Sequence, residues 1–179
     1  KPDAVFGYGH EEDRLLWSNW ESHHGIKWVP MACAADATIY KATTAHQDKD
    51  LDIVYLGGRW TYKGQTIDRF LLPALKKAKK EESMSYSVRG WGDWPNGICE
   101  GILPEDESNQ FLNRGRIAPC ISEQHTHQFG IDIPERMFKV ALCGALIIHD
   151  TVPTVRNFLD SAIVSVNVDN FYDLIRHYH

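Results

Sequence analysis

The sequence predicts an α/β protein with a parallel β-sheet and helices on both of its faces. Two observations support this fold class. From Leu51 to the C-terminus, short apolar runs alternate with segments whose apolar residues recur at helical spacing, the pattern of a doubly wound sheet. Residues 145–148 are all apolar, as expected of a parallel strand buried on both faces. The 179 residues suffice for one good core, or for one domain and part of another.

The composition is that of a globular protein and restricts the classes of partner. No apolar run has the length of a membrane span. The net charge of -5 gives no general attraction to nucleic acid or to an anionic membrane, so local groups must hold any anionic ligand. We therefore expect no nucleic-acid partner. The N-terminus lacks the pattern of a signal peptide and the four cysteines form no CxxC pair, so we expect a cytoplasmic protein.

The first 50 residues predict a small unit and a loop. Residues 3–8 and 26–30 are short extended segments, and residues 11–20 between them form a helix with acidic residues near its start. Residues 41–50 are polar without periodicity, so we expect a surface loop there.

The first strand of the main sheet is expected at Leu51–Leu56, an apolar run that stops at Gly57. Helical spacing over residues 65–82 predicts the next helix, which Pro73 should kink or divide. Residues 85–91 alternate as a strand does, and turn residues follow them.

The middle of the chain predicts another helix and strand. A short helix is expected at residues 106–115, followed by a strand at 116–122 that Pro119 interrupts, because proline cannot donate to a ladder. Residues 123–129 are polar, and we interpret them as a loop. The last expected elements are a helix at 154–159, a strand at 162–166 and a helix at 170–179.

A capped helix and the strand after it place polar groups at one edge of the sheet. Asp132 and Glu135 have the spacing of a capping box, and Pro134 fits the first helical turn. His149 and Asp150 then come directly after the apolar run at 145–148, where open α/β sheets bind ligands. A helix N-terminus at this edge would be ready to bind an anion.

Residues 57–64, GGRWTYKG, form the first motif that could carry chemistry. Glycines after a strand let backbone amides approach a ligand, and Arg59 and Lys63 add two cations at the same end of the sheet. The alternative is a tight turn whose cations face solvent.

His125 and His127 form a second candidate site. On an extended segment, residues two apart point the same way, so both rings could face one substrate. A metal site would need a third ligand, which no recognisable spacing supplies, so we expect no metal. Surface loop histidines are the alternative, and Glu135 joins the pair as a catalytic candidate unless it only caps its helix.

Trp91, Asp93 and Trp94 form a third candidate site. An exposed tryptophan beside a carboxylate is a usual way to hold a sugar ring. The alternative is that the tryptophans fill space between the sheet and a helix.

The helix before residue 141, the sequence ALCGALII at 141–148 and the Asp at position 150 resemble the C-terminal domain of GT-B glycosyltransferases. The closest likeness is to the group-1 type related to spore-maturation glycosyltransferases. The resemblance implies a Rossmann-like domain that binds a nucleotide-sugar donor, such as a UDP-sugar, without a metal or other cofactor. It also implies that the donor diphosphate contacts Gly58, Arg59, Lys63 and Arg136.

The resemblance further places the donor nucleoside and sugar near Trp91, Ile102 and Lys139. Lys139 is a departure, because the family has a Glu there that binds the ribose of the donor. Either Glu135 replaces that contact, or the ribose is held differently, or the donor is bound weakly.

In this interpretation residues 1–40 are the end of an N-terminal domain and the crossing to the next one, and residues 41–179 bind the donor. The expected reaction transfers a sugar to a glycan, lipid or protein acceptor, and a missing N-terminal domain or a partner chain would supply the rest of the site. The alternative is a non-catalytic nucleotide- or sugar-binding or assembly module, which the Lys at position 139 favours. A dinucleotide-dependent enzyme is disfavoured because no GxGxxG follows a strand.

Overall fold

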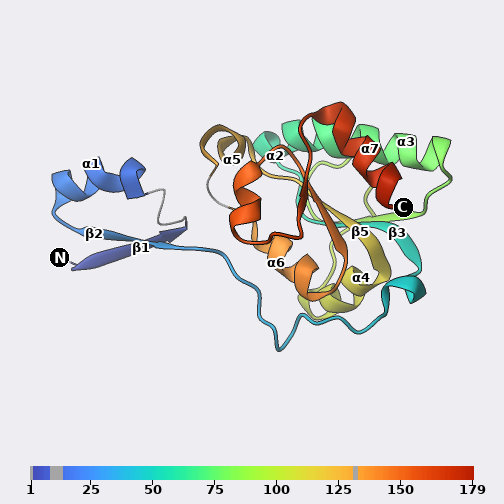
Figure 1. The fold of residues 1–179 in the computed structure, drawn as a ribbon, viewed down its shortest axis with the longest axis horizontal. Helices are drawn as coiled ribbons and strands as arrows, with labels where there is room; N and C mark the ends of the chain where they lie inside the picture. The colour runs from blue at the N-terminus through green and yellow to red at the C-terminus, as the bar shows by residue number, and fades with distance from the viewer. Residues whose placement is uncertain (1, 9–13, 131–132) are drawn as a thin grey trace.

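The computed structural model describes residues 2–8, 14–130 and 133–179. Two parallel sheets are present in these residues: a two-stranded sheet of β1 and β2, and a five-stranded sheet in the order β4-β3-β5-β6-β7. Figure 1 shows the two-stranded sheet and its helix set apart from the larger domain and joined to it by an extended segment. The predicted α/β fold with a parallel sheet is confirmed.

The N-terminal unit consists of β1 (Ala4–Tyr8), α1 (Arg14–His24) and β2 (Lys27–Met31). The indole of Trp28 is buried and stacks on that of Trp17, with ring centroids 5.0 Å apart. The expected segments are thus confirmed, except that residues 11–13 lie outside the described residues.

Residues 32–50 connect the N-terminal unit to the first strand of the larger domain. Tyr40 is buried against that domain, and its hydroxyl donates a hydrogen bond to Glu105. Lys49 is also buried and donates to the carbonyls of Asn113 and Cys143, 3.0 and 3.2 Å away. The surface loop expected at 41–50 is therefore anchored at both of its ends, and it contains the 3-10 turn η2 (His46–Asp48).

The elements of the larger domain alternate along the chain. Their bounds are β3 (Leu51–Leu56), α2 (Thr61–Thr66), the π-helical turn η3 (Ile67–Leu71), α3 (Leu72–Glu81), β4 (Tyr86–Arg89), the 3-10 turn η4 (Glu105–Glu107), α4 (Ser108–Arg114), β5 (Gly115–Cys120), α5 (Gln124–Phe129), α6 (Glu135–Leu142), β6 (Leu146–His149), the 3-10 turn η5 (Pro153–Asn157), β7 (Ile163–Val164) and α7 (Val168–Tyr178).

Helices cover both faces of the five-stranded sheet (Figure 1). Side chains alternate along β3, so Ile53 and Tyr55 pack in the cluster that includes residues of α3 and α7. Val54 points the other way, into the cluster with residues of α4 and α6. This alternation produces the two buried cores that a doubly wound sheet requires.

The winding of the sheet reverses between β3 and β5. β3 pairs with β4 on one side and with β5 on the other, all in parallel. The carboxyl ends of β3 and β5 therefore border the topological switch point, where open α/β sheets bind their ligands.

Pro119 ends the ladder between these two strands early. The pairs run Leu51 to Gly115 and Ile53 to Ile117, and the next would set Tyr55 opposite Pro119. Proline has no N–H to donate, so the pairing stops, while β5 continues to pair with β6. The predicted strand is therefore confirmed. Pro119 leaves the end of this strand unpaired on the side of β3.

Two predictions of local structure were wrong, and a third was confirmed. Residues 124–129 form the helix α5 rather than a loop. The division predicted at Pro73 is present: the π-helical turn η3 ends at Leu71 and α3 begins at Leu72, so Pro73 lies in the first turn of α3, where its missing N–H is tolerated. Pro134 is the residue before α6, so Glu135 is its first residue rather than the third position of a capping box. Asp132 lies outside the described residues.

The helices in the described parts of the chain are all too short or too polar to cross a bilayer.

Candidate functional site

A buried arginine occupies the gap at the switch point. Arg136, near the start of α6, is 8% exposed, and its guanidinium donates to the carbonyls of Leu56 and Ile121, each 2.9 Å away. The first carbonyl belongs to the last residue of β3, and the second belongs to the residue after β5. The guanidinium also lies over the ring of Tyr55, 4.6 Å from its centroid. Arg136 thus holds together two strand ends that Pro119 prevents from pairing.

Glycines around Arg136 keep the backbone close. A Cβ atom at Gly57 would overlap Nη1 of Arg136, and one at Gly90 would overlap the carbonyl oxygen of Gly57. The amide of Gly57 donates to the carbonyl of Arg89, 2.9 Å away, which extends the pairing of β3 and β4 past the strand ends. The glycine turn therefore brings the backbone directly onto the buried cation.

Lys63 on α2 is a second buried cation beside this one. Its side chain is 6% exposed, and its ammonium lies over the ring of Trp60, 5.0 Å from the centroid. Burial and the positive charge of Arg136 lower the pKa of Lys63 to about 7. Within the described part of the chain, no group accepts a hydrogen bond from this ammonium or forms an ion pair with it. A lysine in this state is prepared to receive an anion.

Lys63 and Arg136 both line a cavity of about 390 Å³ at the carboxyl ends of the strands, here called the first cavity. Gly57 and Gly58 line it as well, so the wall carries two cations and close-packed backbone. Such a wall suits a ligand with concentrated negative charge, such as a diphosphate.

Aromatic and apolar side chains form the rim of the first cavity. Trp91 is 53% exposed and stacks on Trp60, with ring centroids 5.1 Å apart and planes within 8° of parallel. Ile102 is also exposed and lines the same cavity. A flat ring or a sugar face could pack against these groups.

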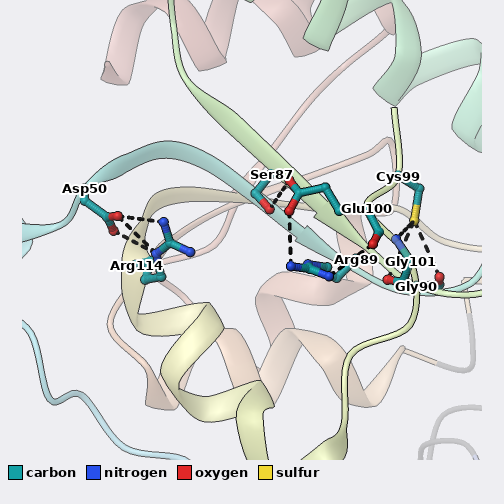
Figure 2. Close-up of polar contacts among 8 residues, drawn as sticks. All are labelled: Asp50, Ser87, Arg89, Gly90, Cys99, Glu100, Gly101 and Arg114. Carbon is teal, nitrogen blue, oxygen red and sulfur yellow. Dashed lines mark hydrogen bonds and ion pairs between the residues drawn. The ribbon is translucent and has the colours of Figure 1, made fainter. Parts of the chain in front are cut away.

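The segment that carries Ile102 is fixed along β4. Figure 2 shows Glu100 between Ser87 and Arg89: its carboxylate accepts from the Ser87 hydroxyl at 2.7 Å and pairs with Arg89 at 3.2 Å. Gly101 adopts a positive φ of 101°, and its carbonyl accepts from the amide of Gly90, 2.9 Å away. The rim therefore rests on a defined backbone rather than on a free loop.

The far side of the first cavity carries a charge cluster. Lys139 pairs with Glu105 at 2.9 Å and with Glu135, one helical turn before it, at 3.0 Å. Burial would lower the pKa of Lys139, but hydrogen bonds to Tyr40, Glu105 and Glu135 raise it above its ordinary value. The ammonium is therefore charged and engaged on several sides.

The sequence profile of the family described as glycosyl transferase-like matches residues 45–179, three quarters of the chain. The chain belongs to this glycosyl transferase-like family. No match was found among curated proteins.

Solved structures with the same fold include glycosyltransferases of the GT-B type. The match to sucrose-phosphate synthase from Thermosynechococcus elongatus covers 99% of this chain and 49% of the synthase chain, with 10% identity and a TM-score of 0.68. A mutant of T4 phage BGT in complex with UDP-glucose matches 99% and 52%, with 14% identity and a TM-score of 0.63. The pneumococcal O-GlcNAc transferase GtfA in complex with UDP and GlcNAc matches 98% and 37%, with 12% identity and a TM-score of 0.59. The chain thus spans about half or less of each of these structures. It matches the C-terminal halves of the GT-B glycosyltransferases.

Most of the predicted donor-site residues lie together in the structure. The first cavity is lined by six of them, Gly58, Lys63, Trp91, Ile102, Arg136 and Lys139, and also by the catalytic candidate Glu135. Arg59 is not among its lining residues. Its guanidinium instead forms a bidentate pair with Asp68, with distances of 2.7 and 3.0 Å, and donates to the carbonyl of Asp93. Its predicted contact with the donor would require this pair to open.

Trp94 does not contribute to the first cavity. Its ring packs edge-on against Tyr55, 5.7 Å between centroids, and its indole N–H donates to the carbonyl of Trp91. The interpretation of the two tryptophans as space-filling therefore holds for Trp94 and not for the exposed Trp91.

The two histidines do not face one site in the way the sequence suggested. Because α5 is a helix, residues two apart point in different directions. His125 is half exposed beside Glu123, 3.7 Å away. His127 instead points inward and contacts the buried Asp150, with Nε2 3.0 Å from Oδ2. Among the described residues, no group of three or more His, Cys, Asp or Glu side chains could hold a metal ion.

The sequence analysis missed Trp60 and Glu105 as site residues. Trp60 could have been suspected, since it follows Arg59 in the glycine motif. Glu105 could not, because its contact with Lys139 joins positions 34 residues apart without any pattern.

Proposed function

We propose that this chain is the donor-binding half of a GT-B glycosyltransferase that transfers a sugar from a nucleotide-diphosphate sugar. One observation carries the proposal: two buried cations, Lys63 and Arg136, line one cavity at the switch point of the sheet. A departing diphosphate develops negative charge, and preorganised cations in a dry site stabilise that charge.

The residues of the first cavity would have different roles. Lys63 and the backbone at Gly58 would contact the diphosphate directly. Arg136 would act through its charge and by holding the two strand ends, because its guanidinium already donates to carbonyls. Trp91 and Ile102 would pack on the nucleoside or the sugar. The donor needs no bound metal in this scheme, because the two cations supply the positive charge.

The N-terminal unit fits the same proposal. Residues 1–40 would be the end of the acceptor-binding domain and the crossing from it, and residues 41–179 the donor-binding domain. The support is that the chain, including its N-terminal unit, matches about half of the length of GT-B structures. The other half would supply further contacts to the acceptor, whether glycan, lipid or protein.

A non-catalytic nucleotide- or sugar-binding module is the second candidate, and Lys139 favours it. A lysine held by Glu105 and Glu135 cannot accept hydrogen bonds from a ribose, as a glutamate there would. Glu135 is more than half exposed and adjoins the cavity, so it could supply that acceptor instead.

Calorimetric titration with UDP, GDP, dTDP and CDP tests the proposal. We expect one of the four to bind, and Lys63→Ala to weaken that binding by about 10- to 100-fold, the usual effect of losing a charged hydrogen bond. Lys80→Ala, which removes an exposed cation outside the cavity, should leave the affinity unchanged. Arg59→Ala reports whether the pair with Asp68 opens for the donor. No binding of any nucleotide to the folded chain would overturn the proposal.

Catalysis needs a separate measurement. Release of free sugar from the matching nucleotide sugar, or its transfer by the chain combined with the N-terminal domain, would support the enzyme. Nucleotide binding without either reaction would favour the non-catalytic module.

A further inference from the structure

A second cavity, of about 310 Å³, shares none of its described lining residues with the first. It lies between the π-helical turn η3 and helix α5, and Thr151, just after β6, forms part of its wall. A π-helical turn changes the direction of the side chains that follow it and is often found at functional sites. Here the turn carries Arg69 and Phe70, which both line the second cavity.

A chain of polar contacts reaches the second cavity from the protein interior. Asp150 is fully buried, and its Oδ2 accepts from the amide of Ser122 at 2.6 Å and lies 3.0 Å from Nε2 of His127. The other ring nitrogen of His127, Nδ1, lies 3.2 Å from the hydroxyl of Thr151. The imidazole also stacks on Phe70, with ring centroids 5.9 Å apart.

The Asp150 carboxylate requires a hydrogen on the ring nitrogen of His127 that faces it. Burial would raise the pKa of Asp150, but the hydrogen bond from His127 and the contact with His149, 2.8 Å away, keep it below its ordinary value. An ionised carboxylate only accepts, so Nε2 of His127 must donate. The other ring nitrogen, Nδ1, faces the Thr151 hydroxyl, and both residues line the cavity.

The other lining groups define the class of ligand. Gln65 and Gln124 offer amides that can both donate and accept, which matches neighbouring hydroxyls on a sugar ring. Arg69 supplies a permanent positive charge at an exposed position. None of the described residues that line it is a carboxylate. A ligand that combines hydroxyls with one anionic group therefore complements this wall better than a neutral sugar does.

We propose that the second cavity binds an acidic sugar, a hydroxylated ring that carries a phosphate or a carboxylate. Arg69 pairs with the anionic group, and the amides of Gln65 and Gln124 and the hydroxyl of Thr151 bind the ring hydroxyls. This inference rests on the proposed function only in naming the role of the ligand, which is the acceptor of the transferred sugar. One exposed guanidinium is too little charge for a diphosphate, so the donor belongs to the first cavity.

The test is an NMR titration of the whole chain, observed at the His127 ring and the Thr151 methyl group. The probes are glucose 6-phosphate, glucuronate, glucose, inorganic phosphate and UDP. We expect glucose 6-phosphate and glucuronate to shift both signals at millimolar concentration. Comparing the affinities of these two ligands shows whether the cavity prefers phosphate or carboxylate. Glucose and inorganic phosphate should each bind at least about tenfold more weakly, because each lacks half of the contacts. UDP should shift signals near Lys63 instead.

Two variants and a control make the result specific. Arg69→Ala and Gln124→Ala alter exposed side chains, so both should fold, and each should weaken the acidic sugar without changing UDP binding. Lys80→Ala should change neither. If inorganic phosphate binds as well as glucose 6-phosphate, or if no acidic sugar shifts the His127 ring, the inference is wrong. UDP binding in that case leaves the proposed function standing. Sugar binding without any nucleotide binding overturns the proposed function and the acceptor role, but not the binding of an acidic sugar in the second cavity.

Discussion

Gly57 has no space for a side chain because the Arg136 guanidinium occupies the place where its Cβ atom would lie. The same guanidinium donates to the carbonyl of Leu56, the residue before that glycine. The glycine turn and the buried cation therefore form one unit, and neither can change alone.

Replacing Gly57 by alanine should displace Arg136. We expect Gly57→Ala to weaken binding of the nucleoside diphosphate by about tenfold and to lower the free energy of unfolding by about 1–3 kcal/mol, as overpacking usually does. Calorimetry and chemical denaturation measure the two effects. Gly64→Ala is the matched control, because a Cβ there meets only ordinary contacts with Arg59 and alanine favours the helix. Equal affinities for the two variants would show that Arg136 does not contribute to the site.

Binding of the diphosphate should take up a proton at Lys63. The pKa of this lysine is about 7 in the free chain, and a bound anion favours its charged form. The affinity should therefore fall as the pH rises from about 7 to about 9. Calorimetry in buffers of different ionisation enthalpy measures the proton directly, and Lys63→Met should abolish the uptake. A pH-independent affinity in the unmodified chain would contradict this role.

The same lysine should make stability depend on pH. The unfolded chain holds the proton of this lysine up to a pKa of about 10.4, while the folded chain releases it near 7, so the unfolded state binds more protons in between. The free energy of unfolding should then increase with pH over that interval. Urea denaturation of the chain and of Lys63→Met tests the sign, since the variant should show a smaller increase.

Replacing Lys139 by glutamate should destabilise the folded chain. A carboxylate at this position would face Glu105 and Glu135, and we expect Lys139→Glu to cost about 1–2 kcal/mol of stability. Adding Glu105→Lys should recover part of that loss, which a double-mutant cycle measures. Additive effects of the two changes would mean that the pair contributes nothing.

Lys49 should matter for stability alone. It is buried, donates to two carbonyls and lies outside both cavities. Lys49→Met leaves those carbonyls without this donor, and we expect a loss of about 1.5–3 kcal/mol with unchanged nucleotide affinity. Lys41→Met, at an exposed position of the same segment, is the control and should be nearly neutral.

The strands of the sheet could be predicted because each has a purely local signal. Leu51–Leu56 was placed to the residue, since an apolar run that ends in glycines has few other interpretations. Helix α5 was missed for the opposite reason. Its residues are polar and carry no periodicity, and its contact with Asp150 joins positions 23 residues apart.

The candidate site was predictable in its residue types but not in its side-chain directions. The motif at residues 57–64 indicated two cations at the sheet edge, yet only Lys63 lines the cavity, because Asp68 binds Arg59. Arg136 was expected at a helix start, but the gap into which it points exists because Pro119 ends a ladder. Such consequences depend on the register of paired strands, which no single stretch of sequence encodes.

The central claim is that the first cavity holds the diphosphate of a nucleotide-sugar donor. A crystal structure of the chain with its tightest-binding nucleoside diphosphate tests this claim most directly. The account predicts that the diphosphate lies within hydrogen-bonding distance of the Lys63 ammonium and the Gly58 amide, with the nucleoside toward Trp91 and Ile102. A diphosphate bound in the second cavity, or anywhere that leaves Lys63 without contact, would contradict the account.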